Sequence, residues 1–343
     1  MTDTMHWVGT WTAAPAPGEG AAFSNHTLRM IPRVSIGGRV LRVRISNAYG
    51  ARPLAIGAAY VGLRSTGPGV VPGSNRRLTF GRESSATIAA GALIVSDPVE
   101  LAVEPLADVA VSVHLPGDLP ASFGITGRYA RQTGAIVAVG DSLTDANIST
   151  HDGHHSWPSQ LARRLMARPS GRLMAVMNQG LGGNRILHDI RGDSGLRRFD
   201  RDVLAQPGVT HTIIMLGTND LRNRPGKAEE EVTAPQMIAG LKQFAVRGQA
   251  RGIKVVGGTL TPFENETFLP GAWNPRREAV RQAVNDWLRK AEGFDAVVDF
   301  DRALRDPGHP TQMLPIYDCG DHLHPSDLGY RTMGDAIDLG LFE

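Results

Sequence analysis

The feature that most constrains this chain is an uninterrupted apolar run at residues 135–139, which ends at Gly140-Asp141-Ser142. A run of this length without alternation is typical of a strand that is buried on both faces, as in a parallel sheet. Residues that leave the carboxyl end of such a strand face the usual ligand crevice, so Ser142 is a candidate nucleophile. The same tripeptide recurs at Gly192-Asp193-Ser194, where no apolar run precedes it. The context of the motif therefore favours Ser142.

Four further apolar runs follow, at spacings that leave room for a helix between neighbours. With the first, they predict strands at Ala135–Val139, Leu173–Met177, Thr212–Leu216, Lys254–Gly257 and Ala296–Phe300. The clearest helix lies between the last two, where Asn274 can cap it and Pro275 suits its first turn. Strands that alternate with helices indicate βαβ units and a parallel sheet. Residues 133–343 are therefore predicted to form a doubly wound α/β domain.

The first third of the chain has a different pattern, because glycine and proline turns separate short strands. Apolar and polar residues alternate over residues 41–46 and 109–115. Such alternation gives a strand one buried and one solvent-facing side, and the turn signals favour antiparallel pairing. Residues 1–132 are therefore predicted to form a β-sandwich or jelly-roll accessory domain. Four of its aromatic residues could form a carbohydrate-stacking surface or part of the core: Trp7, Trp11, Tyr49 and Tyr60.

Composition and charge exclude several classes of protein. The 343 residues are 41% apolar and 20% charged, and their formal net charge of +2 gives no electrostatic case for binding nucleic acid or an anionic membrane. The single cysteine, Cys319, allows no intrachain disulfide. Residues Met1 to His6 lack the basic and apolar regions of a secretory signal. We expect a cytoplasmic protein with neither nucleic-acid nor membrane partners, and homo-oligomer formation is left open.

The loops after the predicted strands offer the parts of a serine hydrolase. A hydroxyl nucleophile needs a base, a group that orients this base, and donors for the oxyanion that forms. His324 can serve as the base, and Asp321, three residues earlier, can accept its second ring proton. The Asn219 amide, the Gly183 backbone N–H and the Ser142 backbone N–H are candidate oxyanion donors. Each motif alone fits an ordinary turn or helix start, but their joint occurrence at these strand ends favours one site.

Together these segments resemble the four conserved blocks of the SGNH (GDSL) hydrolase superfamily. The matching segments are Gly140-Asp141-Ser142-Leu143, Asn178 through Gly183, Gly217-Thr218-Asn219-Asp220 and Asp321-His322-Leu323-His324-Pro325. The resemblance covers residues 134–343 and implies a flavodoxin-like five-stranded sheet and no cofactor. It implies a catalytic triad of Ser142, His324 and Asp321, an oxyanion hole of Ser142, Gly183 and Asn219, and supporting positions for Asp141 and Asn178. Residues 1–132 resemble the N-terminal domain of a bacterial subgroup that includes acetylxylan-esterase-like members.

We therefore expect a carboxylic ester hydrolase that cleaves short-chain acyl esters, acetyl esters above all, of small molecules or carbohydrates through an acyl-enzyme. Two alternatives stay open. One is a lysophospholipase or thioesterase of the same fold, and the other is a non-catalytic carbohydrate-binding protein. The segment from Phe263 to Trp273, with Phe268, could wall the acyl pocket or act as a lid.

Several residues leave competing interpretations. His322 could compete with His324 for the role of base, although the family's Asp-x-x-His-Pro spacing selects His324. Arg185 could bind a substrate substituent, but an ion pair with Asp189, four residues on, is expected if the segment is helical. Cys319 is an alternative nucleophile, which we expect to be a small buried thiol instead.

Two groups of residues suggest a metal, but neither has a recognised zinc-binding spacing. They are His151, Asp152, His154 and His155, and the set Asp318, Asp321, His322 and His324. A dinucleotide fingerprint is incomplete as well, because Arg185 stands where the third glycine after Gly180 and Gly182 would be required. We therefore expect neither a metal site nor a nucleotide site.

Overall fold

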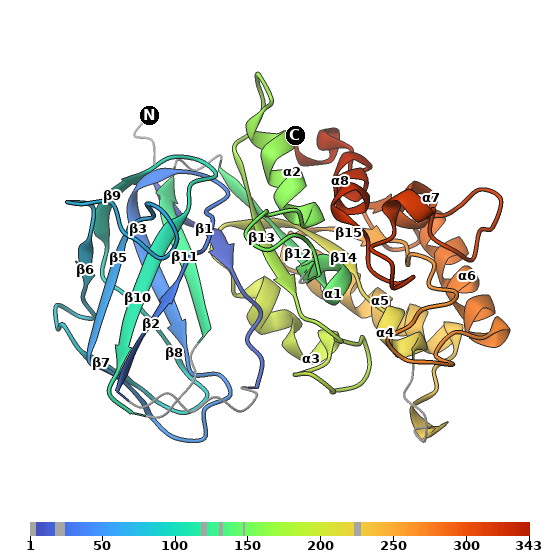
Figure 1. Ribbon diagram of the computed structural model, residues 1–343, viewed down its shortest axis with the longest axis horizontal. Helices are drawn as coiled ribbons and strands as arrows, with labels where there is room; N and C mark the ends of the chain where they lie inside the picture. Colours follow the sequence, from blue (N-terminus) through green and yellow to red (C-terminus); the bar gives the residue numbers. More distant parts are fainter. Residues whose placement is uncertain (1–4, 18–24, 118–121, 130–132, 147, 223–227) are drawn as a thin grey trace. The chain divides into compact units, whose positions relative to one another are not determined.

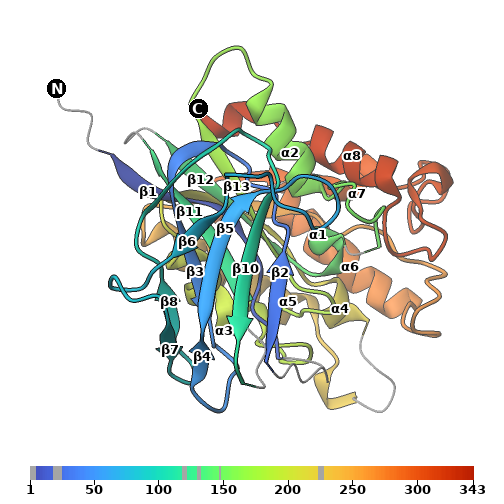
Figure 2. The ribbon, with the colours of Figure 1, turned by 60° about the vertical axis from the view of Figure 1, so that its left-hand side comes forward.

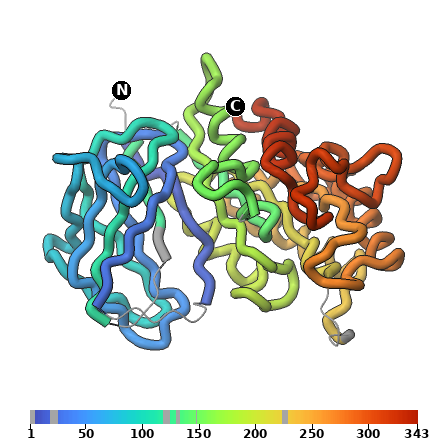
Figure 3. Tube along the Cα trace, viewed as in Figure 1, coloured from blue at the N-terminus to red at the C-terminus, as the bar shows by residue number. Residues whose placement is uncertain are grey.

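The computed structural model describes residues 5–17, 25–117, 122–129, 133–146, 148–222 and 228–343. The chain divides into two compact units, Met1–Ala135 with Arg172–Met177, and Ile136–Gly171 with Asn178–Glu343 (Figure 3). The predicted domain boundary lies between residues 132 and 133, directly after positions 130–132, which are outside the described residues. So are residues 1–4, on which the expected absence of a secretory signal partly depends.

The first unit holds two principal antiparallel sheets. One has the strand order β1-β11-β3-β8, with β9 also paired to β3, and the other has the order β2-β10-β5-β6 (Figure 2). Strands β4 and β7 pair separately. The strands are β1 (His6–Thr12), β2 (His26–Met30), β3 (Gly38–Ser46), β4 (Leu54–Ile56), β5 (Ala58–Leu63), β6 (Arg76–Leu78), β7 (Ala86–Ile88), β8 (Leu93–Val95), β9 (Val99–Val103), β10 (Val109–Leu115) and β11 (Ser122–Tyr129).

Alternation along β3 builds one side of this unit's core. Leu41, Val43 and Ile45 are buried in a single apolar cluster that also takes residues from β5, β10 and β11. Strand β10 differs from the predicted alternation because it is buried along almost its whole length. Its Ser112 hydroxyl accepts a hydrogen bond from Arg29 of β2 at 2.8 Å. The predicted antiparallel β domain is confirmed.

A five-stranded sheet organises the rest of the chain, in the order β13-β12-β14-β15-β16. Numbered from its own first strand, this is the order 2-1-3-4-5 of flavodoxin-like domains, so the predicted doubly wound fold is confirmed. The strands are β12 (Gly134–Gly140), β13 (Met174–Gly180), β14 (Val209–Met215), β15 (Lys254–Gly258) and β16 (Ala296–Val298). Strand β15 pairs in parallel with both β14 and β16.

Helices cover both faces of this sheet. Helices α2 and α8 pack together on one face, and α3, α5 and α6 lie on the other (Figure 1). The helices are α1 (Ser142–Asp145), α2 (Trp157–Met166), α3 (Gly195–Phe199), α4 (Thr218–Leu221), α5 (Ala234–Gln249), α6 (Pro275–Arg289), α7 (Phe300–Leu304) and α8 (Asp327–Asp335). Shorter helical turns are η1 (Asp200–Leu204), η2 (Ala228–Glu230), η3 (Pro315–Tyr317) and η4 (Leu339–Phe342). Within the described residues, none of the helices has the length and apolar character needed to span a bilayer.

Local side chains explain where the predicted element limits hold and where they do not. Asn274 caps α6 as predicted, since its side chain accepts from the Arg277 N–H at 3.0 Å. Strand β16 ends earlier than predicted, because Asp299 caps α7 by accepting from the N–H of Arg302 at 3.0 Å. Strand β13 runs on to Gly180, so Asn178 lies inside the strand and not in the loop after it.

Candidate active site

Ser142 stands at the carboxyl end of the central strand β12, whose residues are all buried. Gly140 has to be a glycine, because an added Cβ would lie 2.6 Å from the Met215 backbone oxygen. Asp141 then caps α1 by accepting the Leu143 N–H at 2.9 Å. The strand and this capped turn present Ser142 at the carboxyl edge of the sheet, where the sequence places it.

His324 comes from a distant loop and meets Ser142 directly. Its Nε2 lies 2.8 Å from Ser142 Oγ, and its Nδ1 lies 2.7 Å from Asp321 Oδ2. If Asp321 accepts the Nδ1 proton, Nε2 is left with a lone pair facing the serine hydroxyl. Burial raises the pKa of Asp321, but hydrogen bonds from the His324 ring and from backbone N–H groups outweigh it and hold that pKa well below its ordinary value. Asp321 is therefore an anion beside the ring.

His322 occupies a different place from His324. Its Nδ1 lies 2.7 Å from Asp318 Oδ2, and its side chain is 49% exposed. The structure thus brings His324, and not His322, to the serine.

A cavity of about 280 Å³ opens beside Ser142 and His324. Gly183 lines it with a backbone φ of +75°, a conformation that favours glycine. Asn219 of α4 lines it as well. The three candidate oxyanion donors therefore lie around one cavity. The remaining lining residues are Ile148, Gly182, Arg185, Ile190, Arg191, Arg222, Phe268 and Leu269.

The two residues in supporting positions hold the strand ends together. Asp141 accepts from the Asn219 side-chain amide at 3.0 Å, and burial raises the pKa of Asp141 to about 6. Asn178 donates to the Thr144 backbone oxygen at 2.9 Å and accepts from the Gly180 N–H at 2.8 Å. Asn178 therefore fixes the turn that carries Ser142 without lining the cavity.

The expected pairing of Arg185 with Asp189 is wrong. Arg185 is buried and pairs with Glu230 at 2.6 Å, whereas Asp189 pairs with Arg197 at 2.6 Å. The segment between them consists of bends and not of a helix, so residues four apart do not share a helix face.

The second Gly-Asp-Ser motif lies in this irregular segment. Ser194 precedes α3 and donates its backbone N–H to Asp189 at 2.6 Å. Asp193 pairs with Arg201 at 2.9 Å. No strand delivers Ser194 to the cavity, in keeping with the context argument from the sequence.

The loop after β15 forms part of the cavity wall. Phe268 and Leu269 line the cavity. The Phe268 ring stands edge-on to the His324 ring, with the ring centroids 5.4 Å apart. Thr267 donates its backbone N–H to the Asp321 backbone oxygen at 3.0 Å, which ties the loop to the segment that carries the histidine.

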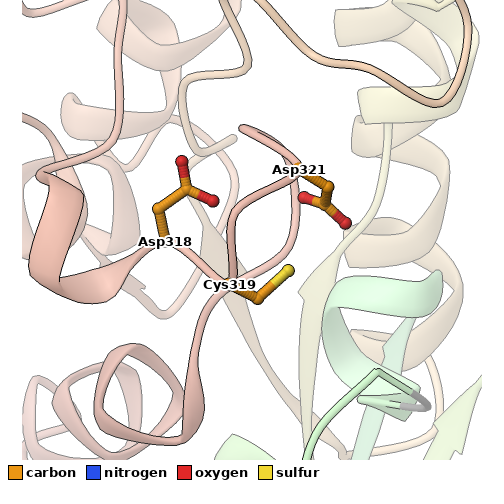
Figure 4. Close-up of side chains that lie close together, drawn as sticks. All are labelled: Asp318, Cys319 and Asp321. Carbon is orange, nitrogen blue, oxygen red and sulfur yellow. The ribbon is translucent and has the colours of Figure 1, made fainter.

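Asp318, Cys319 and Asp321 bring potential metal-ligand atoms within 4.8 Å of one another (Figure 4). Both carboxylates already accept hydrogen bonds within their loop, Asp318 from His322 and Asp321 from His324. These contacts give the acidic side chains a role in shaping the loop. The Cys319 thiol is exposed, contrary to the expectation of a buried one. Partial burial and the neighbouring carboxylates raise its pKa to about 11, which disfavours the nucleophilic thiolate.

The other histidine group is spread over a surface loop. His151 is almost fully exposed and lies 3.8 Å from Asp152, while His155 lies 3.6 Å from Asp327. Among the described residues, these side chains do not form a cluster of metal-ligand atoms.

Residues 138–332, more than half of the chain, match the GDSL-like Lipase/Acylhydrolase family. The chain belongs to this family. The predicted class of activity, carboxylic ester hydrolysis, is thereby confirmed for this GDSL hydrolase. A search of curated proteins found no significant match.

Solved structures similar to this GDSL hydrolase come from several sources. A lipolytic protein of the G-D-S-L family from Desulfitobacterium hafniense is 23% identical, with 59% of this chain and 96% of that chain covered and a TM-score of 0.44. An acetylxylan esterase from Geobacillus stearothermophilus is 21% identical, with coverages of 59% and 91% and a TM-score of 0.45. An α/β hydrolase from the metagenome of Lake Arreo is 22% identical, with coverages of 59% and 92% and a TM-score of 0.46.

Sequence reasoning missed two residues next to the candidate site. Arg222 follows Asn219 by three residues and donates to its side-chain oxygen at 2.8 Å. Glu266, in the loop after β15, pairs with Arg222 at 3.0 Å. The available signals were a donor about one helical turn after Asn219 and two acids, Glu264 and Glu266, beside the apolar residues of that loop.

Proposed function

We propose that the protein is a serine esterase that hydrolyses short-chain acyl esters, acetyl esters above all, of small molecules or carbohydrates. The observation that carries the proposal is the 2.8 Å contact between Ser142 Oγ and His324 Nε2, with Asp321 2.7 Å behind the ring. The proposal is also supported by Gly183 and Asn219, the candidate oxyanion donors, which line the adjoining cavity.

In the proposed mechanism, His324 takes the hydroxyl proton as Ser142 Oγ attacks the ester carbonyl carbon. The carbonyl oxygen becomes an oxyanion that accepts from the backbone N–H groups of Ser142 and Gly183 and from the Asn219 amide. The intermediate collapses, and His324 returns the proton to the departing alcohol. Water then attacks the acyl-enzyme with His324 again as base, which releases the acid and restores the serine.

Asn219 needs one amide hydrogen for the oxyanion. Its Nδ2 donates to Asp141 Oδ2 at 3.0 Å and to the Asn184 backbone oxygen at 3.2 Å. Hydrogen bonds to charged acceptors are stronger than those to neutral ones. An oxyanion should therefore replace the Asn184 backbone oxygen as acceptor, because this oxygen is neutral and its contact is the longer of the two. The contact with Asp141 can then persist through the reaction.

The size of the cavity supports a small acyl group. Its volume of about 280 Å³ lies just below the range for small-molecule sites, which is roughly 300–1,000 Å³. Three apolar side chains that line the cavity suit a short acyl chain: Ile148, Ile190 and Phe268.

The proposal is tested by comparing the wild type with Ser142→Ala on p-nitrophenyl acetate, butyrate and octanoate and on acetylated xylo-oligosaccharides. We expect kcat/KM to be highest for acetyl esters and kcat to fall by roughly 10⁴-fold or more in Ser142→Ala with circular dichroism unchanged. Full activity in Ser142→Ala would contradict the mechanism. A preference for octanoyl esters would contradict the substrate class and favour a lysophospholipase or thioesterase.

A further inference from the structure

The amide of Asn219 is fixed in one orientation by three partners. Its Nδ2 donates to Asp141 Oδ2 and to the Asn184 backbone oxygen, and its Oδ1 accepts from Arg222 Nη1 at 2.8 Å. Guanidinium groups only donate, whereas carboxylates and carbonyls only accept. Turning the amide over would place NH₂ against the guanidinium and the carbonyl against two acceptors. Arg222 is the one donor among the three, and it fixes which end of the amide carries the oxygen.

Arg222 is itself held by a two-point ion pair. Its Nε lies 3.1 Å from Glu266 Oε1, and its Nη2 lies 3.0 Å from Glu266 Oε2. The two side chains are 12% and 1% exposed. Paired hydrogen bonds of this kind fix the plane of the guanidinium as well as its position. The direction of Nη1, and so of its contact with Asn219, depends on Glu266.

Glu266 also fixes the loop that walls the cavity. Its Oε2 accepts from the backbone N–H groups of Phe268 and Leu269 at 3.0 and 3.2 Å. One carboxylate therefore joins the cavity wall to the arginine that orients the amide.

We infer that Arg222 and Glu266 are positioning residues that preorganise Asn219 for the oxyanion and couple it to the Phe268–Leu269 wall. The inference rests on the proposed function, because it assigns Asn219 to the oxyanion. Preorganised donors stabilise a transition state without reorganisation during the reaction, so their loss lowers kcat more than it weakens substrate binding.

The first test replaces Arg222 by Met, which keeps an unbranched stem and removes the donors. We expect kcat on p-nitrophenyl acetate to fall by roughly 10- to 100-fold, somewhat less than for loss of the oxyanion donor itself, with KM changed less than about threefold. Arg222→Lys, which keeps one donor, should recover part of kcat. Glu266→Gln should lower kcat as well. A glutamine amide is neutral and has one acceptor oxygen, so it cannot accept from both guanidinium nitrogens as the carboxylate does.

The deciding test is a double-mutant cycle with Asn219→Ala. If Arg222 acts through Asn219, Arg222→Met should change kcat by less than about twofold once Asn219 is alanine. An undiminished effect of Arg222→Met in the Asn219→Ala background would overturn the inference, because Arg222 would then contact substrate directly or act only on the fold.

Arg289→Met is the matched control. Arg289 pairs with both carboxylate oxygens of Asp299, at 2.9 and 3.2 Å, and does not line the cavity. We expect this variant to lose thermal stability and keep kcat. A loss of kcat in Arg289→Met equal to that in Arg222→Met would mean that losing any such ion pair impairs the enzyme, and the inference would fail.

Full activity in Ser142→Ala would remove the proposed function itself. Unchanged kcat in Asn219→Ala would remove the oxyanion role of Asn219, on which the positioning role of Arg222 and Glu266 depends. Large losses in both of these variants, together with additive behaviour of Arg222→Met, would leave the proposed function intact and remove only the positioning role.

Discussion

Asn219 is the side chain on which the proposed oxyanion site depends most. Asn219→Ala removes one donor and should lower kcat by roughly 10²–10³-fold while KM changes little. Steady-state kinetics on p-nitrophenyl acetate measure this effect. A loss below about tenfold would contradict its role as a donor. Asn178→Ala, which alters only the supporting turn, should lower thermal stability more than kcat.

Cys319 lies close to Asp321 but lacks the character of a nucleophile. Its pKa is raised to about 11, so little thiolate exists at neutral pH. We expect Cys319→Ser to keep most of the esterase activity, and iodoacetamide at neutral pH to leave the wild type largely active. Loss of activity in Cys319→Ser, together with inactivation of the wild type by iodoacetamide, would point to a cysteine mechanism instead.

Individual residues show how far the sequence could predict the site. Ser142 and His324 could be paired from motif order and strand ends although they stand 182 positions apart, because parallel strands bring such loops to one edge. The Arg222–Glu266 pair could not be predicted. Its partners lie 44 positions apart in loops without regular periodicity, so no pattern fixes their distance.

Among the elements, the loop after β15 bears most directly on substrate choice. Phe268 lines the cavity, is 58% exposed and faces the His324 ring. Phe268→Ala should open the wall and raise activity on butyrate relative to acetate by roughly tenfold, about the effect of one methylene in a pocket. Ile316→Ala, which removes another large exposed apolar side chain outside the cavity, serves as control. An unchanged ratio of the two activities in Phe268→Ala would show that the loop does not wall the acyl group.

Element limits were predicted less well than element order. The apolar run Leu173–Met177 marks β13, yet the strand continues through Asn178 to Gly180, because backbone pairing extends beyond the apolar residues. The expected pair of Arg185 with Asp189 failed for a related reason, since it assumed a helix where the chain bends, and Asp189 instead accepts from Ser194 and Arg197. Irregular segments take their shape from distant partners that periodicity does not report.

At the scale of the whole molecule, buried carboxyl groups should make stability depend on pH. Burial raises the pKa of both Asp141 and Asp220 to about 6. Between roughly pH 4 and 6 the folded chain therefore binds more protons than the unfolded chain, and the free energy of unfolding should fall as pH rises through this window. Asp321 and Asp299, whose pKa values are lowered, act in the opposite sense and lose their stabilisation as pH falls below about 4.

Urea unfolding at pH 4.5 and 6.5 measures this slope. Asp220 accepts the backbone N–H groups of Ile186 and Leu187 at 2.7 and 3.1 Å, so Asp220→Asn should lower stability at both pH values and make the difference between them smaller. A difference that stays as large as in the wild type would contradict the assignment to this carboxyl group.

The fold as a whole was predictable because the two parts of the chain have different patterns of apolar residues. Strict alternation on β3 and uninterrupted apolar character on β12 distinguish a sheet with one buried face from a sheet covered on both. The pairing of β10 between β2 and β5 was not predictable, because alternation says which side of a strand is buried and not which strand lies beside it.

The central claim is that Ser142 is the nucleophile, and covalent labelling tests it most directly. The wild type would be treated with an organophosphate such as paraoxon, digested, and mapped by mass spectrometry against Ser142→Ala. We predict one label per chain, on Ser142, with activity lost in proportion to labelling and no label in the variant. A label on Ser194 or Cys319, or full inactivation without modification of Ser142, would contradict it.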